Sequence, residues 1–279
     1  MIKQNLHTHS LYCDGKNTIE DMTLEAIQKG FTILGFSGHG NCREIDDYSM
    51  TDDNTQKYIQ DVLEVKEKYK DQIHIFLGIE EDILGQSFEK NNPYDYIIGS
   101  VHFVKAGEEY LAVDQSQEVT HKIVDYYGDF LSYAQSYYEE VKKIAYRSDV
   151  DIVGHIDLLT KFNENEEFID FNNQEYLKLA YKCIDMLIDQ KKIFEVNTGA
   201  IARGQRKTPY PHHILLKYIH DHGGKICLNS DCHQKEMLDC YYKESLELIQ
   251  DCGFTSMMVL TDQGFIEKDI QEFYKNGDK

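Results

Sequence analysis

Short runs of apolar, β-branched residues alternate along the chain with longer stretches whose apolar positions recur at helical spacing. This alternation is typical of successive βα units, in which parallel strands share one sheet and helices cover it. The pattern predicts seven strands, namely a first run that leads into His7 and the segments 33–37, 73–79, 96–101, 152–154, 193–197 and 225–229.

The stretches between these runs are predicted as helices. Thr18, three residues before Asp21, is typical of an N-terminal cap for a helix that ends near Lys29, and Gly30 can close that helix in the left-handed conformation. A last apolar run at 257–260 is either a closing strand or an edge strand. The other helices are predicted at about 53–69, 118–147, 173–190, 212–222 and 239–251.

Seven βα units fit a barrel of seven or eight strands more simply than an open sheet. The chain has 279 residues, within the usual range for one α/β barrel, and it contains no linker-like or repetitive segment. We therefore predict an α/β barrel in which residues 1–279 form a single domain.

Charge and composition narrow the classes of partner. The formal net charge of −20 opposes binding to nucleic acid phosphates or anionic lipid, and no apolar run approaches the length of a membrane span. The first residues lack the apolar core of a signal peptide, and the 7 cysteines are scattered without a Cys-x-x-Cys pair. We expect a cytoplasmic protein with reduced thiols that binds neither nucleic acid nor membrane. No feature indicates its oligomeric state.

Metal-ligand side chains follow the predicted strands. A lone His or Glu after a strand is usually a solvated loop residue, but the ends of parallel barrel strands meet on one face, so that seven such ends point at one place. His7 and His9 lie two positions apart, which puts both imidazoles on the same side of an extended chain. The residues concerned are His7, His9, His39, Glu80, His102, His155, Glu195, Asp231 and His233.

This set predicts the kind of metal and the number of ions. Imidazole and carboxylate ligands without thiolates suit Zn, Mn or Fe, and so many ligands exceed what one ion can use. We predict two or three divalent transition-metal ions, with Glu80 able to bridge two of them. The Asp14-Gly15 pair has two readings, a tight turn alone or a turn that returns Asp14 to the site as a ligand or general acid. His74 is assigned to packing or to a contact with a helix, and the histidines at positions 121, 220 and 222 are assigned to the surface. The pair at 212 and 213 starts a helix and either faces a ligand or, as we favour, has no role in the site.

The ordered motifs resemble those of the polymerase and histidinol phosphatase (PHP) superfamily across nearly the whole chain. Three further segments resemble the monofunctional histidinol-phosphate phosphatases within it, namely Ser100-Val101-His102, Glu195-Val196-Asn197-Thr198 and Tyr210-Pro211. The superfamily motifs are His7-Thr8-His9, Asp14, Gly38-His39, Gly78-Ile79-Glu80, Gly99-Ser100-Val101-His102, Gly154-His155 and Ser230-Asp231-Cys232-His233.

The resemblance implies a distorted (β/α)7 TIM-like barrel with a trinuclear metal centre at the C-terminal ends of the strands. Many members of the superfamily have His where this chain has Asp14, and Glu195 has no firm role in the scheme. The implied ligands are His7, His9, Glu80 and Asp231 for one ion, Glu80, His102 and His155 for a second, and Asp14, His39 and His233 for a third.

The resemblance also implies an activity, the hydrolysis of L-histidinol phosphate to L-histidinol and phosphate in histidine biosynthesis. A metal-activated hydroxide would attack phosphorus, and Asp14 or His233 would protonate the leaving alkoxide. Basic side chains from the loops would clamp the phosphate, with Arg203 as the main candidate and Lys161 and Arg43 as weaker ones. Residues Glu44, Asp46 and Asp47 either supply an acidic rim suited to the cationic end of the substrate or, as we favour, form a solvated acidic loop.

Other functions remain open at this point. A PHP phosphodiesterase or exonuclease that acts on nucleotides or DNA ends has the same ligands, and so has a phosphotyrosine phosphatase. The negative charge and the lack of a basic channel disfavour DNA. A binding module without turnover is disfavoured because such a module has little reason to keep every ligand.

Overall fold

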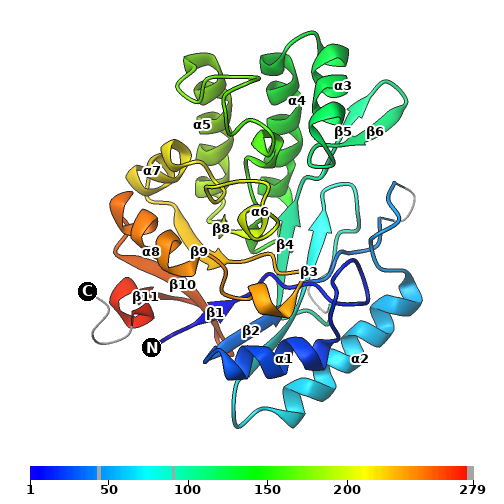
Figure 1. Cartoon of the computed structure of the whole chain (residues 1–279), viewed down its shortest axis with the longest axis vertical. Helices are drawn as coiled ribbons and strands as arrows, with labels where there is room; N and C mark the ends of the chain where they lie inside the picture. The colour runs from blue at the N-terminus through cyan, green and yellow to red at the C-terminus, as the bar shows by residue number, and fades with distance from the viewer. Residues whose placement is uncertain (43–44, 90–91, 275–279) are drawn as a thin grey trace.

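Seven parallel strands form one sheet in the computed structural model of this protein, which describes residues 1–42, 45–89 and 92–274 (Figure 1). The strands follow one another in the order β1-β2-β3-β4-β7-β8-β9. They correspond to the seven runs that the sequence predicted. Their bounds are β1 Gln4–Asn5, β2 Ile33–Phe36, β3 His74–Asp82, β4 Tyr96–Ser100, β7 Ile152–Val153, β8 Ile193–Asn197 and β9 Lys225–Asn229.

The first and last strands meet beyond their C-terminal ends, and this contact nearly closes the sheet into a barrel. The amide of His9 donates to the carbonyl of Cys232 at 2.9 Å, and the amide of Cys232 donates to the carbonyl of His7 at 3.0 Å. The side-chain amide of Asn5 donates to the hydroxyl of Ser230 at 2.6 Å. These bonds join the segments that carry the first and last predicted metal ligands, and they confirm the predicted barrel.

The other end of the seam is filled by a hairpin of β10 (Ser256–Thr261) and β11 (Gly264–Asp269). The side chain of Gln4 donates to the carbonyl of Met258 at 3.2 Å and accepts from the amide of Leu260 at 2.9 Å. Leu260 also packs with Leu6 in the core inside the barrel. The run at 257–260 therefore belongs to a separate antiparallel pair that plugs the seam, which makes the barrel irregular.

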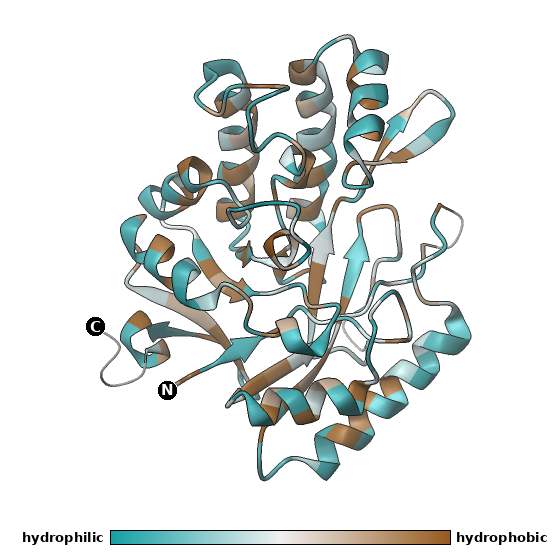
Figure 2. Cartoon of the chain, in the orientation of Figure 1, coloured by the Kyte–Doolittle hydropathy of each residue, from teal (hydrophilic) through white to brown (hydrophobic). Residues whose placement is uncertain are grey.

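Helices cover the outside of the barrel (Figure 1). Thr18 caps α1 by accepting a hydrogen bond from the amide of Asp21 at 3.0 Å, and Gly30 follows with φ of 74°, as the sequence predicted. Along the helices hydrophobic and hydrophilic residues alternate, which is the pattern of elements with one face on a core (Figure 2). The helices are α1 Ile19–Gln28, α2 Asp52–Lys68, α3 Gln117–Tyr127, α4 Phe130–Lys142, α5 Gln174–Asp189, α6 Gly199–Ala202, α7 His213–Asp221 and α8 Tyr242–Asp251, with short 3₁₀ turns at Lys143–Tyr146, Leu158–Thr160, Lys235–Met237 and Ile270–Phe273.

The prediction of one helix over 118–147 was wrong. Helix α3 ends at Gly128, whose φ of 91° is left-handed, and its amide donates to the carbonyl of Val124. Asp129 then caps α4 by accepting from the amide of Ser132 at 2.7 Å. The Gly-Asp pair is a stop signal followed by a start signal, and continuous apolar spacing hid the break.

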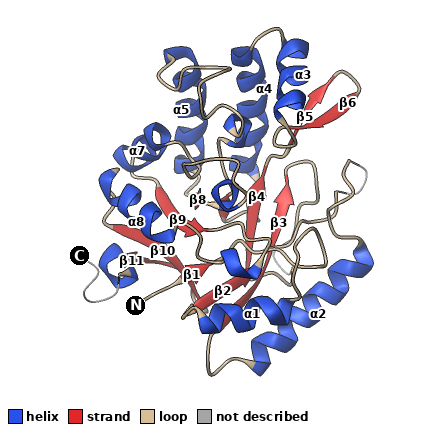
Figure 3. Cartoon of the chain, in the orientation of Figure 1, coloured by secondary structure: helices blue, strands red, loops and turns tan. Residues whose placement is uncertain are grey.

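A second antiparallel hairpin, absent from the prediction, follows β4. Strands β5 (Phe103–Ala106) and β6 (Glu109–Ala112) pair across a turn at Gly107, and the hairpin stands beside α3 (Figure 3). It carries Phe103 and the chain that follows β6 to the rim of the barrel. Among the helices of the described residues, none is long and apolar enough to cross a membrane.

Candidate metal centre

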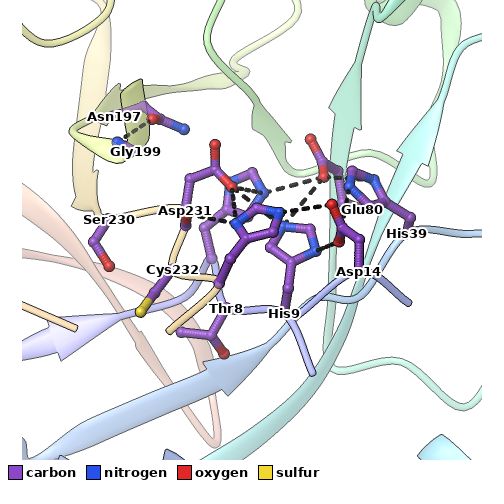
Figure 4. A network of polar contacts seen from close by, with 12 residues as sticks. Thr8, His9, Asp14, His39, Glu80, Asn197, Gly199, Ser230, Asp231 and Cys232 are labelled. Carbon is purple, nitrogen blue, oxygen red and sulfur yellow. Dashed lines mark hydrogen bonds and ion pairs between the residues drawn. The ribbon is translucent and has the colours of Figure 1, made fainter. Parts of the chain in front are cut away.

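The predicted ligands converge on one site at the C-terminal ends of the strands (Figure 4). They come from strand ends or from the loops that follow them, with His7, His9 and Asp14 after β1 and Asp231 and His233 after β9, so the barrel itself sets their positions. Glu80 lies within β3, and its carboxylate is at the centre of the group. Its two oxygens lie 3.0–3.6 Å from imidazole nitrogens of five residues, His7, His9, His39, His102 and His155.

Asp231 and Asp14 hold the other sides of the cluster. Asp231 Oδ1 lies 3.2 Å from His9 Nε2 and 3.7 Å from His7 Nε2. Asp14 Oδ2 lies 3.0 Å from His233 Nε2, and Asp14 Oδ1 lies 3.7 Å from His39 Nε2. The Asp14-Gly15 turn thus returns the carboxylate to the site.

The turn that carries Asp14 depends on Gly15. The Gly15 amide donates to the carbonyl of Ser10 at 3.0 Å, and a Cβ at position 15 would lie 2.4 Å from the Ser10 amide nitrogen. Both readings of this dipeptide, as a tight turn and as a carrier of a site residue, describe the same geometry.

The side chains fit divalent ions. Three sets each place their ligand atoms within 4.8 Å of one another. Within the part of the chain that the structure describes, four buried atoms in these sets have no hydrogen-bond partner, and a buried polar atom without a partner is costly unless something else binds it. These atoms are His7 Nε2, His9 Nε2, Asp14 Oδ1 and Glu80 Oε2, and the three sets are His9-Asp14-His39-His233, His7-His9-Glu80 and His39-Glu80-His102.

The electrostatics of the cluster favour an ionised carboxylate at its centre and treat the imidazoles differently from one another. Burial alone would raise the pKa of Glu80, but the charges of His7, His39 and His102 lower it well below its usual range. Burial, together with repulsion from His233 and His39, lowers the pKa of His9 to about 3. Glu80 is therefore ionised and His9 neutral at pH 7, which are the states that a cation requires. Burial alone would lower the pKa values of His7, His39 and His102, but the nearby carboxylates raise them, so an ion that binds these imidazoles must displace protons.

Two carboxylates behind the ligands orient the imidazoles. Glu195 Oε1 lies 2.6 Å from His7 Nδ1, so the Nε2 atom of His7 faces the site. Glu195 also accepts hydrogen bonds from the His155 amide at 3.1 Å and from the side chains of Asn197 and Asn229, both at 2.9 Å. Such carboxylate partners fix the tautomer and orientation of metal-binding histidines. The structure thus gives Glu195 a supporting position that sequence reasoning had left open.

Asp82 plays the same part for His102, and sequence reasoning missed it. Its Oδ2 accepts from the His102 amide at 2.8 Å and lies 3.2 Å from His102 Nδ1. The available signal was the spacing, since residues 80 and 82 of one strand face the same side. The strand was predicted to end at 79, but β3 continues to Asp82.

The basic side chains predicted to clamp a phosphate differ in their positions. Arg203 reaches the centre, where one nitrogen lies 3.1 Å from Asp231 Oδ2 and another 3.1 Å from His233 Nδ1. Lys161 lies farther out and forms an ion pair with Asp114 at 3.0 Å. Arg43 and Glu44 lie outside the described residues.

A cavity of about 450 Å³ opens above the cluster. Its lining combines predicted metal ligands with Arg203, Lys161, Asp114, Tyr48 and Phe103, and it includes Asp46 and Asp47 of the acidic segment. Among the other histidines, the prediction that His74 packs was wrong, because this residue is exposed at the start of β3. His121 and His222 are exposed, and His212 stacks on Phe171 with ring centroids 3.9 Å apart.

Comparisons with known proteins agree with this geometry. A family model described as "PHP domain" matches residues 5–199. A probable histidinol-phosphatase of Schizosaccharomyces pombe is 28% identical over 280 residues, which cover 91% of this chain and 88% of that protein. The histidinol-phosphatase of Bacillus subtilis is 24% identical over 270 residues, covering 88% of this chain and 99% of that protein.

Two solved structures share the fold. One is a candidate histidinol phosphatase, hisK, of Listeria monocytogenes, with a TM-score of 0.77 and 20% identity over 87% of this chain and 99% of that chain. The other is the histidinol phosphate phosphatase of Lactococcus lactis in complex with zinc, L-histidinol and phosphate, with a TM-score of 0.71 and 18% identity over 95% of this chain and 98% of that chain.

Proposed function

The chain belongs to the PHP domain family, and from this premise we propose that it is a metal-dependent phosphomonoesterase that hydrolyses L-histidinol phosphate to L-histidinol and phosphate. One observation carries the proposal, the convergence of imidazoles and carboxylates from six strand ends, with buried ligand atoms that lie close together beneath an open cavity. The names of the relatives support the substrate. Two proteins that align with most of this chain, and over most of their own length, are named as a histidinol-phosphatase and a probable histidinol-phosphatase. We place the activity in histidine biosynthesis in the cytoplasm.

The residues that would hold the ions are those predicted from the sequence. We propose two or three divalent transition-metal ions, of which zinc is favoured by the zinc complex of the Lactococcus lactis protein. Ions held there would lower the pKa of water and neutralise charge on the phosphoryl oxygens. The proposed ligands are His7, His9, Asp14, His39, Glu80, His102, His155, Asp231 and His233.

Side chains of the protein would complete the reaction. Arg203 keeps N–H donors beyond those directed at Asp231, and its side chain is 31% exposed toward the cavity, so it can bind phosphoryl oxygens in a forked geometry. We propose that Asp14 or His233, whose Oδ2 and Nε2 atoms are 3.0 Å apart, helps to protonate the leaving alkoxide. Lys161 lies on the wall of the same cavity and would add positive charge.

The test is a comparison of substrates with the metal-loaded protein. We expect kcat/KM for L-histidinol phosphate to exceed the values for a phosphotyrosine peptide, mononucleotides, bis(p-nitrophenyl) phosphate and single-stranded DNA by about 100-fold or more. Preferential cleavage of the diester or of DNA would assign the protein to the nuclease branch of the family. Preference for the phosphotyrosine peptide would assign it to protein dephosphorylation.

A further inference from the structure

The cavity above the metal centre has a wall of opposite charges that metal binding does not use. Lys161 and Asp114 form it, with Nζ and Oδ2 3.0 Å apart. The Lys161 side chain is only 5% exposed, whereas that of Asp114 is 29% exposed, and both residues line the cavity. A buried ammonium needs a counter-charge, and Asp114 supplies it while still facing the open space.

The position of Asp114 is the unusual feature of this wall. Asp114 follows the hairpin strand β6 and reaches the cavity beside the cluster. Burial alone would raise the pKa of Asp114, but the charges of Lys161, His102 and Arg203 lower it. Asp114 is thus a carboxylate among the groups that would receive a phosphate. Asp114 neutralises Lys161, and its exposed side, which would repel a phosphate, presents negative charge to the cavity and so suits a cationic group of the substrate.

We propose that Asp114 is a specificity-determining residue that binds a protonated amine of the substrate, next to the phosphate ester. The inference rests on the proposed function and deepens it, because it assigns the substrate to the phosphate monoesters of 2-amino alcohols. Such a molecule carries an anion and a cation a few bonds apart. The Lys161–Asp114 pair presents the complementary charges side by side on one wall.

The rest of the cavity suits a flat ring on the same substrate. The rings of Tyr48 and Phe103 are nearly parallel, at 12°, with centroids 6.5 Å apart, and both line the cavity. Asp46 holds the Tyr48 loop by accepting hydrogen bonds from the amides of Tyr48 at 3.1 Å and Ser49 at 2.8 Å. Burial raises the pKa of the Tyr48 hydroxyl, and the charges of Asp114 and Asp46 raise it further, so this ring stays neutral. Neutral aromatic surface favours stacking with a heterocycle.

The test combines one substitution with a pair of substrates that differ only in the amine. The pair is L-histidinol phosphate and 3-(imidazol-4-yl)propyl phosphate, which lacks the amino group. For Asp114→Asn we expect kcat/KM with L-histidinol phosphate to fall about 30-fold more than kcat/KM with the analogue, because the bond to the substrate amine is lost only in the first case, whereas the ion pair with Lys161 is weakened for both substrates. The matched control is Asp125→Asn, the same charge change at an exposed position of α3, for which neither value should change.

A second readout separates this inference from the proposed function. Calorimetric binding of L-histidinol, which needs no turnover, should weaken about 100-fold in Asp114→Asn, while binding of 3-(imidazol-4-yl)propanol stays the same. If the wild-type protein binds L-histidinol in this way but hydrolyses neither ester, the proposed function fails and the role of Asp114 stands. Equal losses with both substrates, or equal binding of both alcohols by the wild-type protein, would overturn the role of Asp114.

Discussion

Single residues of this site could be predicted from the sequence where a side chain able to bind metal stands at the end of a predicted strand. Imidazole and carboxylate groups at the ends of parallel strands predicted the ligands, because a barrel brings those ends together. Lys161 was predicted from its charge as a phosphate binder, but its ion pair with Asp114 joins loops 47 residues apart, and sequence spacing does not reveal such a contact. The functional roles of Arg203, Lys161 and the metal ligands stay predictions that substitution can test.

Glu195 provides such a test at the level of one side chain. For Glu195→Gln we expect affinity for the metal ions to fall by about 10- to 100-fold, because the amide cannot hold His7 Nδ1 with the same charge-assisted bond. The measurement is competition for metal with a chromogenic chelator. Glu108→Gln, in the exposed turn between β5 and β6, is the matched control. Unchanged affinity in the Glu195 variant would show that the carboxylate does not support the site.

Elements were predicted well where their pattern was long and regular. The seven parallel strands were found from apolar runs, whereas the β5–β6 hairpin was missed because residues 103–112 mix apolar and polar positions without clear alternation. The break between α3 and α4 depends on two residues, Gly128 and Asp129, and helical spacing on both sides concealed it. Local conformational signals of this kind outweigh periodicity over a few residues.

The short helix α6 gives a prediction at this scale. A Cβ at Gly199, the first residue of α6, would lie 2.7 Å from Asp231 Oδ2 and 2.8 Å from Asp231 Cβ. Gly199→Ala should therefore displace Asp231 and lower kcat/KM by about tenfold or more, with loss of bound metal, since small displacements of reacting groups are costly. Elemental analysis and steady-state kinetics measure both effects. Ala202→Ser, in the same helix, should retain wild-type values, and wild-type metal content in Gly199→Ala would contradict this view of Asp231.

Closure of the barrel is a property of the whole molecule that the sequence only suggested. Strand β1 has two residues, and its contact with β9 is made by the loop segments at Thr8 and Cys232. The hairpin that plugs the other end of the seam was visible in the sequence only as four apolar residues. Pairing across the seam joins the first and last parts of the barrel, so it depends on contacts between residues more than 200 positions apart. The assignment of 1–279 to one domain stays a prediction.

The stability of the seam should depend on pH through Asp239. Asp239 accepts hydrogen bonds from Lys3 at 2.7 Å and from Lys29 at 2.8 Å. Burial alone would raise the pKa of Asp239, but these bonds lower it. A carboxyl whose pKa is lower in the folded state stabilises the fold above its unfolded pKa of about 3.9, and this stabilisation is lost as the pH falls through the folded value.

We therefore expect Asp239→Asn to reduce the free energy of unfolding at pH 7 by about 1 kcal/mol, the order found for partly exposed ion pairs. The difference from the wild-type protein should shrink as the pH falls below about 4. Urea unfolding curves at several pH values measure it, with Asp125→Asn as the control. A constant difference from pH 7 to pH 3 would exclude the ion pairs as its cause.

The central claim is that this barrel hydrolyses a phosphomonoester by means of its metal centre. The most direct test measures phosphate release from L-histidinol phosphate by protein that has been stripped with a chelator and then titrated with zinc or manganese, with Glu80→Gln alongside. The account predicts no turnover in the stripped protein, activity that returns as two or three equivalents of metal bind, and loss of about 1,000-fold or more in Glu80→Gln, because metal ions and their charge supply most of the catalysis. Full activity without metal, or no activity after the ions have bound, would contradict it.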